Sequence, residues 1–371
     1  MDSRPVRTLL AGVVAAALTL SACSPDRTDG GPTGTSAPTA APGETSTATA
    51  PAAPTTTTAP ATSTGPATTA TPTGERAGAT TAPGAAAQEP DQDRAGRPKD
   101  TLPDGAVTAL LLGTDSRTPG AMDGNADAIM LAQLSADRQQ LALVSITRDS
   151  WVEIPGLGEG KINSAFARGG TPTMRETVSD LFGGLEIDYV VQTDFEGFIS
   201  MTRALDGFTV DNEHASSVTI DATGRVVDFP EGETDLENTD GLIYVRERMS
   251  LPLGDLDRTE RQRAAVAGML ERIGQIAPDE EALQEAMGHL VARSRITGDL
   301  DLADALALAE LTRDPAGREV VSLMAPITGF GTIAGQSVNL VDEERTAELG
   351  AALRAGDVSD YVAEHGTGYA P

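Results

Sequence analysis

The chain has 371 residues and a formal net charge of −28 at pH 7, with 55 acidic and 27 basic residues and a single cysteine. Nearly all of the negative charge lies beyond residue 100, where 46 acidic residues accompany 20 basic ones. This balance excludes a nucleic-acid-binding domain, because such a domain needs a broad basic face to neutralise phosphates. A single cysteine also excludes an intramolecular disulfide, so the fold depends on its core alone.

The N-terminus predicts secretion and a lipid anchor. Two arginines precede an apolar run at residues 9–20, which is too short for a permanent membrane span and is followed by small residues. Cys23 then stands where a bacterial lipoprotein signal places the cysteine that becomes lipidated. We therefore predict a lipoprotein signal at 1–23 and a protein anchored on the extracytoplasmic face of the bacterial membrane. An ordinary cleaved signal with a chance cysteine is the alternative.

Composition divides the rest of the chain. Residues 24–101 are dominated by Thr, Ala, Pro, Gly and Ser, and such a segment cannot bury enough apolar surface to offset its conformational entropy. We predict a disordered linker there. The residues from 102 onward are numerous enough for one sizeable core. We predict a single folded domain at 102–355 and a C-terminal tail at 356–371.

Apolar runs and helical periodicity predict the elements of this domain. Strands are expected at 107–112, 128–134, 141–146, 151–154, 187–192 and 320–324, and helices at 172–182, 195–205, 258–276, 281–292, 302–311 and 343–354. The second and third strands are joined by a turn and predict a hairpin. Residues 209–233 are polar and turn-rich, and 242–248 are ambiguous. Because strands and helices alternate, the fold class is α/β, with a central mixed β-sheet flanked by helices on both faces.

Arginine is concentrated in one segment, 244–263, which reads YVRERMSLPLGDLDRTERQR. Its arginines are Arg246, Arg248, Arg258, Arg261 and Arg263, a quarter of the basic residues beyond position 100. The planar guanidinium group suits phosphate oxygens. We therefore predict a site for a phosphate ester or anhydride. A set of structural salt bridges to the many carboxylates is the alternative.

A helical wheel of the predicted helix at 258–276 sorts these residues. Arg258 and Gln262 fall on the apolar stripe and Arg261 lies at its edge, whereas Arg263 is expected at the ordinary surface. Asp257 followed by Glu260 resembles a capping box at the start of the helix. An anion at this end of the helix would meet both guanidinium groups and free backbone N–H groups.

Candidate metal ligands and a second cation lie elsewhere in the chain. Asp115 follows the first predicted strand and Asp127 opens the second, so the two carboxylates meet if these strands are neighbours. Paired carboxylates with phosphate oxygens are typical of Mg²⁺ sites, although solvent-facing turn aspartates are the alternative. Lys161 is one of two lysines in an arginine-rich set of cations. A P-loop around it is excluded, because Pro155 and Ile162 occupy positions that need glycine and Ser or Thr.

Five motifs follow one another along the chain: LLGTDSR at 111–117, SITRD at 145–149, KINSAF at 161–166 with Gly169-Gly170, YVRER at 244–248 and GDLDRTERQ at 254–262. In these motifs and their order the chain resembles the LytR–CpsA–Psr family of bacterial envelope phosphotransferases, over about residues 104–276. The resemblance implies transfer of a glycan-1-phosphate from a polyprenyl-pyrophosphate carrier onto peptidoglycan. It also implies Mg²⁺, a hydrophobic tunnel for the polyprenyl chain and a three-layer sandwich.

The resemblance also implies roles for individual residues. Asp115 and Asp127 would hold the metal, and either is a candidate base; Arg148, Arg258 and Arg261 would act with them in catalysis. The implied substrate-binding residues are Arg117, Lys161, Arg246, Arg248 and Gln262.

Three positions depart from the family pattern. Asn125 replaces an arginine, Thr147 replaces a proline, and Asp206-Gly207-Phe208 replaces Gly-Gly-Val. The candidate tunnel residues fit a plain core equally well: Phe166, Val178, Leu181, Phe182, Val190, Phe195 and Phe198.

A glycopolymer–peptidoglycan phosphotransferase is therefore the leading hypothesis. A non-catalytic polyprenyl-pyrophosphate glycolipid-binding protein and a polyprenyl-pyrophosphate hydrolase are the alternatives. The expected partners are a polyprenyl-pyrophosphate-linked glycan donor, a peptidoglycan acceptor and the membrane, reached through the lipid anchor. We expect a monomer that binds no nucleic acid.

Overall fold

The computed structural model describes residues 105–116, 123–298, 305 and 318–369. The predicted signal with Cys23, the linker at 24–101, Arg117 and nearly all of the predicted helix at 302–311 lie outside these residues. In the part of the chain that the structure describes, no helix combines the length and the apolar character that crossing a membrane requires.

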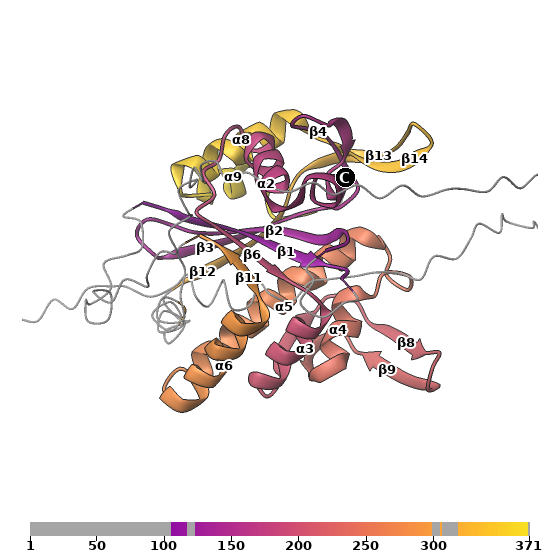
Figure 1. Ribbon diagram of the computed structural model, residues 1–371, viewed down its shortest axis with the longest axis vertical. Helices are drawn as coiled ribbons and strands as arrows, with labels where there is room; N and C mark the ends of the chain where they lie inside the picture. The colour runs from indigo at the N-terminus through magenta and orange to yellow at the C-terminus, as the bar shows by residue number, and fades with distance from the viewer. Residues whose placement is uncertain (1–104, 117–122, 299–304, 306–317, 370–371) are drawn as a thin grey trace, which may run out of the picture. The chain divides into compact units, whose positions relative to one another are not determined.

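A six-stranded mixed sheet forms the centre of the fold (Figure 1). Its strands, in spatial order, are β11 (Arg295–Thr297), β6 (Tyr189–Thr193), β1 (Val107–Thr114), β2 (Ala126–Leu134), β3 (Gln140–Ile146) and β12 (Glu319–Met324). β1, β2 and β3 are antiparallel neighbours, whereas β6 and β12 run parallel to β1 and β3. Every residue of β1, β2 and β3 is buried, as expected for strands covered on both faces. The predicted hairpin is confirmed.

Helices cover both faces of this sheet, which confirms the predicted layered α/β arrangement (Figure 1). One face carries α2 (Asn163–Leu181), α8 (Glu343–Ala355), α9 (Ser359–His365) and a small sheet in the order β13 (Ile327–Ile333), β14 (Gln336–Val341), β4 (Ser150–Ile154), β5 (Gly158–Lys161). The other face carries α3 (Phe195–Ala204), α4 (Asn238–Arg246), α5 (Asp255–Ile276), α6 (Glu280–Arg293) and the strand pairs β7 (Phe208–Asn212) with β10 (Gly232–Leu236) and β8 (Ser216–Ile220) with β9 (Arg225–Phe229).

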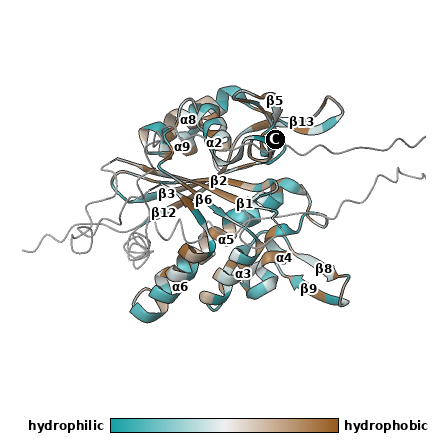
Figure 2. Cartoon of the chain, viewed as in Figure 1, coloured by the Kyte–Doolittle hydropathy of each residue, from teal (hydrophilic) through white to brown (hydrophobic). Residues whose placement is uncertain are grey.

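The alternation of side chains along β1 produces two separate cores. Leu110 and Leu112 pack with α2 and α8, while Ala109 and Leu111 pack with α3, α5 and α6. Figure 2 shows apolar residues concentrated on the central strands between these layers.

The two cores also separate the candidate tunnel residues. Phe166, Val178, Phe182 and Val190 are buried in the core beside α2, and Leu181 packs against it. Phe198 and Phe195 belong to the core on the opposite face. The sheet lies between the two groups, so a single tunnel lined by all of these residues is wrong.

Sequence patterns missed several elements. The polar segment at 209–233 forms most of β7 to β10, whose strands alternate buried and exposed residues too briefly to produce a clear period. α2 begins at Asn163, nine residues before the predicted start, and is kinked at Gly170 (φ 68°). The predicted start at Pro172 marks the second part of this helix, where proline fits a first turn. The ambiguous stretch at 242–248 lies largely in α4.

Candidate functional site

The arginine-bearing helix α5 begins at Asp255, three residues before the predicted start. Gly254 precedes it with φ 57°, a conformation that favours glycine. Asp257 lies in the first turn, and its Oδ2 accepts a hydrogen bond from the Leu253 backbone N at 2.6 Å. The predicted capping box is therefore wrong, since Asp257 is inside the helix and closes the preceding loop onto it.

The inward face of α5 agrees with the helical wheel. Arg258 and Gln262 are 1% and 2% exposed, and Val266, Met269 and Ile273 continue the same stripe into the core. Near its N-terminus the buried face is thus cationic, and further along it is apolar. Burial lowers the pKa of Arg258, although Asp255 and Asp127 oppose that effect.

Three guanidinium groups surround one carboxylate at the start of α5. The Oδ1 atom of Asp255 lies 2.8 Å from Arg258 Nη2, 3.3 Å from Arg248 Nη1 and 3.8 Å from Arg148 Nε. We call Arg148, Arg248 and Arg258 the arginine cluster. They come from the end of β3, the loop after α4 and the first turn of α5, so residues 110 positions apart in the sequence meet here. Sequence reasoning missed Asp255, which only its place in the GDLDR motif could have indicated.

The predicted carboxylate pair lies beside this cluster. Asp115 and Asp127 flank the last residue pair of the β1–β2 ladder, Thr114 and Ala126. Asp127 is 3% exposed, and its Oδ1 accepts a hydrogen bond from Arg148 Nη1 at 2.9 Å. Burial raises the pKa of Asp127, as does the charge of Asp115, while Arg148 and Arg258 counteract part of this shift. Asp115 accepts hydrogen bonds from the backbone and side-chain nitrogens of Asn125.

Two departures from the family pattern have local contacts that explain how the fold accommodates them. Asn125, which replaces an arginine, holds both oxygens of Asp115 through its backbone N at 2.6 Å and its Nδ2 at 3.3 Å. Thr147, which replaces a proline, has its hydroxyl 2.7 Å from Ser150 Oγ and accepts a bond from Asn339 Nδ2 at 2.8 Å. Side-chain hydrogen bonds thus restrain the turn before Arg148.

Lys161 is linked to Arg148 through Asp149. Its Nζ is 2.8 Å from Asp149 Oδ1, and Asp149 Oδ2 is 3.8 Å from Arg148 Nε. The antiparallel β4–β5 pair places Lys161 opposite Trp151, two residues beyond Asp149. Cations and carboxylates therefore alternate from Lys161 through Asp149 and Arg148 to Asp127.

Arg246, Gln262 and Arg261 occupy different surroundings. Arg246 lies over the Phe195 ring at 4.7 Å, and Gln262 Nε2 donates to the Val245 carbonyl at 3.4 Å. Arg261 is fully buried and stacks on the Tyr244 ring at 4.5 Å, while its Nη2 donates to the His214 carbonyl and Ser216 Oγ. Its Nε and Nη1 are buried without a hydrogen-bond partner. Arg261 thus joins α5 to the β7–β8 region, away from the arginine cluster.

Arg263 is not a surface residue, so that prediction is wrong. It is 2% exposed, its Nε donates to Ser322 Oγ at 2.7 Å, and its Nη1 donates to Ser145 Oγ. Burial lowers the pKa of Arg263 to about 10. The helical wheel misplaced Arg263 because it identifies only the one face of α5 that carries the apolar stripe. A second side of α5 is covered by β12 and by the C-terminal residues around Tyr369.

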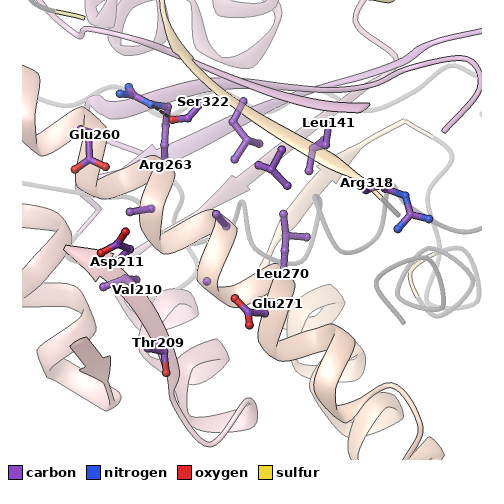
Figure 3. A pocket seen from close by; sticks show the side chains of 15 residues that line it. Leu141, Thr209, Val210, Asp211, Glu260, Arg263, Leu270, Glu271, Arg318 and Ser322 are labelled. Atoms are coloured by element: carbon purple, nitrogen blue, oxygen red, sulfur yellow. Dashed lines mark hydrogen bonds between the residues drawn. The ribbon is translucent and has the colours of Figure 1, made fainter. Parts of the chain in front are cut away.

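A cavity of about 450 Å³ runs along α5 between β3, β12 and β7 (Figure 3). Most of its wall is apolar, including Leu141, Leu143 and Leu270. Glu260 and Arg263 line it near the start of α5, and Glu271 and Arg318 line it further along (Figure 3). Burial raises the pKa of Glu260 to about 7. The candidate tunnel residues predicted from the sequence do not line this cavity.

The arrangement can bind an oligoanion beside a divalent cation. Buried Nε atoms of Arg148 and Arg258 have no hydrogen-bond partner, so this part of the cluster has unused donors. Within the described residues no group of three or more His, Cys, Asp or Glu side chains gathers to hold a metal. Mg²⁺ commonly takes only one or two carboxylates and completes its shell with phosphates and water, so Asp115 and Asp127 fit that pattern.

Comparison with known proteins identifies the family. The LytR_cpsA_psr family profile matches residues 75–355, well over half of the chain. The chain belongs to the LytR–CpsA–Psr family. A relative from Oceanobacillus iheyensis, named polyisoprenyl-teichoic acid–peptidoglycan teichoic acid transferase TagU, is 30% identical over 261 residues, covering 66% of this chain and 76% of that protein.

Three further similar proteins support the same family and fold. An Enterococcus faecalis protein of the same name is 32% identical over 168 residues, and the chain spans about half of that relative, 53% of its length. The crystal structure of B. subtilis TagV has a TM-score of 0.57 at 21% identity, covering 69% of this chain and 99% of TagV, which establishes the shared fold. TagT bound to LIIa-WTA has a TM-score of 0.55 at 25% identity, over 70% of this chain and 93% of TagT.

Proposed function

We propose that this protein is a phosphotransferase that moves a glycan-1-phosphate from a polyprenyl-pyrophosphate carrier onto peptidoglycan. The observation that carries the proposal is the arginine cluster, whose three guanidinium groups share the single carboxylate of Asp255 beside Asp115 and Asp127. The Oceanobacillus iheyensis relative is named for transfer of a polyisoprenyl-linked polymer to peptidoglycan, which supports the same reaction class.

The donor pyrophosphate binds the arginine cluster in this proposal. Asp255 keeps the three guanidinium groups together before the donor arrives, because like charges at this spacing repel one another without a counter-ion. Phosphate oxygens then take over its contacts with Arg148, Arg248 and Arg258, which suit planar, paired acceptors. Lys161, which Asp149 links to Arg148, binds the rest of the head group in this proposal.

The reaction is a displacement at phosphorus. A hydroxyl oxygen of a peptidoglycan sugar forms a bond to the phosphorus that carries the glycan, and the bond from that phosphorus to the bridging oxygen breaks. Polyprenyl phosphate leaves with the bridging oxygen. The arginine cluster stabilises the charge that develops on this leaving group. In this proposal Asp127 takes the hydroxyl proton, because Arg148 fixes the orientation of its carboxylate.

Mg²⁺ would be held by Asp115 and Asp127 together with donor phosphates. When bound, it supplies charge neutralisation at the pyrophosphate. The charge of Asp115 contributes to the raised pKa of Asp127, and a divalent cation held by these carboxylates would offset their repulsion.

The apolar cavity along α5 receives part of the polyprenyl chain in this proposal. It begins where Glu260 and Arg263 lie, five residues or fewer beyond Arg258, and continues past Leu143 and Leu270. Burial of isoprenoid carbon there stabilises the complex by about 25 cal/mol per Å² of apolar surface removed from water. In this proposal a lipid anchor on Cys23 holds the domain at the surface of the membrane in which the carrier lies.

A three-product assay tests the proposal. Purified protein is incubated with Mg²⁺, a polyprenyl-pyrophosphate glycan and a peptidoglycan fragment, and donor binding, polyprenyl phosphate release and acceptor labelling are measured together. We expect release and labelling in equal amounts, and loss of both in Arg148→Ala. Tight binding without release identifies a glycolipid-binding protein instead, and release without labelling identifies a hydrolase. Either result refutes the proposed transfer.

A further inference from the structure

The C-terminal end of the described chain returns to the start of α5. After α9 ends, the chain turns at Gly366 (φ 73°) and brings Tyr369 to the first turn of the arginine-bearing helix. The Tyr369 hydroxyl donates to Asp257 Oδ1 at 3.0 Å and lies 3.4 Å from Glu213 Oε2. A contact between residues 112 positions apart is formed only in the completed fold.

Tyr369 touches α5 through its ring as well as its hydroxyl. The guanidinium carbon of Arg263 lies 5.4 Å from the centre of the ring, within the range of a cation–π contact. The ring also packs against a small apolar cluster of Leu256, Met324 and Ile327. One side chain therefore contacts the first turn of α5, the third turn of α5 and the adjoining ends of β12 and β13.

Asp257 links this contact to the arginine cluster. It is 1% exposed and immediately precedes Arg258, and its other oxygen accepts from the Leu253 backbone N. Leu253 belongs to the loop between α4 and α5, which also carries Arg248. Asp257 therefore accepts one hydrogen bond from Tyr369 and one from the α4–α5 loop. Together these bonds fix the orientation of the first turn of α5, which carries Arg258, and the position of the loop, which carries Arg248.

We propose that Tyr369 is a positioning residue for the arginine cluster, acting through Asp257; the inference rests on the proposed function of that cluster. Loss of the hydroxyl removes the hydrogen bond to Asp257 Oδ1, which His214 Nε2 also faces at 3.9 Å, and Asp257 is a buried carboxylate whose charge acts on Arg261. That carboxylate then competes with the donor phosphates for cations, because a buried charge without a hydrogen bond reorients toward an opposite charge. Nothing in the five family motifs includes Tyr369.

The experiment uses the single tryptophan of the chain as a reporter. Trp151 lies opposite Lys161 and two residues from Asp149, so an anion at the arginine cluster changes its fluorescence. The wild-type protein, Tyr369→Phe, Asp257→Asn and the double variant are titrated with a short-chain polyprenyl diphosphate, and transfer is measured in parallel. Tyr361→Phe is the matched control, since Tyr361 lies in α9 on the same terminal segment and contributes to the core beside α2.

We expect Tyr369→Phe to bind the probe about tenfold more weakly, the loss typical of one hydrogen bond to a charged group. Asp257→Asn removes the charge that Tyr369→Phe frees, but it also alters the bond from the Leu253 backbone N, so it should weaken binding on its own. The double variant should bind no more weakly than Asp257→Asn, because Tyr369→Phe then frees no carboxylate. Tyr361→Phe should bind like the wild type. If Tyr369 has only a structural role, Tyr369→Phe lowers the melting temperature, but its effect on probe binding does not depend on the residue at position 257.

Wild-type affinity in Tyr369→Phe, or losses that multiply in the double variant, overturns the inference. If the wild-type protein binds the probe but transfers nothing, the proposed function fails while the binding comparison still decides the role of Tyr369. The two failures are therefore distinguishable.

Discussion

Replacing Arg258 with methionine separates the catalytic from the structural contribution of the arginine cluster. Methionine replaces the unbranched stem and most of the volume of the arginine side chain but lacks its charge and donors. Arg258 Nη2 lies 2.8 Å from Asp255 Oδ1, the position that a donor phosphate takes over in the proposed reaction. Two unit charges about 4 Å apart at an effective dielectric of about 20 interact by about 4 kcal/mol. Loss of that interaction in the transition state lowers kcat/KM by about a thousandfold.

Stability should change much less than activity. Removing one partner of a buried pair commonly costs about 3–5 kcal/mol, because the other charge is stranded. Asp255 is not stranded here, since Arg248 and Arg148 remain 3.3 Å and 3.8 Å away, and the repulsion among the three arginines is reduced. We therefore expect the free energy of unfolding to fall by about 1 kcal/mol, the net value of one hydrogen bond.

The assay is transfer of labelled glycan at subsaturating donor, with thermal unfolding followed on the same preparations. Arg272→Met is the matched control, because Arg272 is on the same helix but donates to the Leu205 carbonyl, at the opposite end from the cluster. The control should transfer at the wild-type rate. If Arg258→Met keeps more than about a tenth of the wild-type kcat/KM while correctly folded, the charge at this position does not stabilise the transition state.

Three further predictions follow from other parts of the chain. Burial raises the pKa of Glu260 from 4.5 to about 7, so the folded form retains a proton that the unfolded chain releases. The contribution of Glu260 to stability is therefore fully present below pH 4.5 and is lost as pH rises through about 7. Glu260→Gln should flatten the decline in melting temperature over this range, and an unchanged profile would show that another group causes it. Mg²⁺ added with a polyprenyl diphosphate should raise the melting temperature of the wild type but not of Asp115→Asn/Asp127→Asn, and an equal rise in both would place the metal elsewhere. Cys23→Ser should release the protein from washed membranes, and full retention of that variant would exclude the lipidated cysteine as the anchor.

The fold was predictable where the sequence pattern is continuous. Long buried runs such as 128–134 and 141–146 allowed the central hairpin to be placed, and the apolar stripe of α5 gave the burial of Arg258 and Gln262. Short strands in the segment 209–233 were missed, because five-residue strands with one exposed face leave too few apolar positions to establish a period. The early start of α2 was hidden by Pro172, which also begins a helical segment.

The site was predictable in its residue types but not in its pairing. A helical wheel relates only residues three and four positions apart in the sequence, and it correctly predicted that Arg258 faces inward. It could not predict that β12 and Tyr369 cover Arg263 from another direction. The position of Asp255 between three arginines depends on the convergence of β3, the α4–α5 loop and α5. Such convergence is a property of the tertiary fold, and only the family motifs anticipated which residues take part.

The most direct test follows the phosphorus atom itself. A donor labelled with ³²P only at the phosphate attached to the glycan is incubated with Mg²⁺, peptidoglycan and the protein, and the acceptor is digested to identify the labelled bond. The account predicts that the label enters peptidoglycan in a phosphodiester that also carries the glycan, and that Arg258→Met reduces this product about a thousandfold. Label recovered as free glycan phosphate, or retained in the donor with the protein bound, would contradict it.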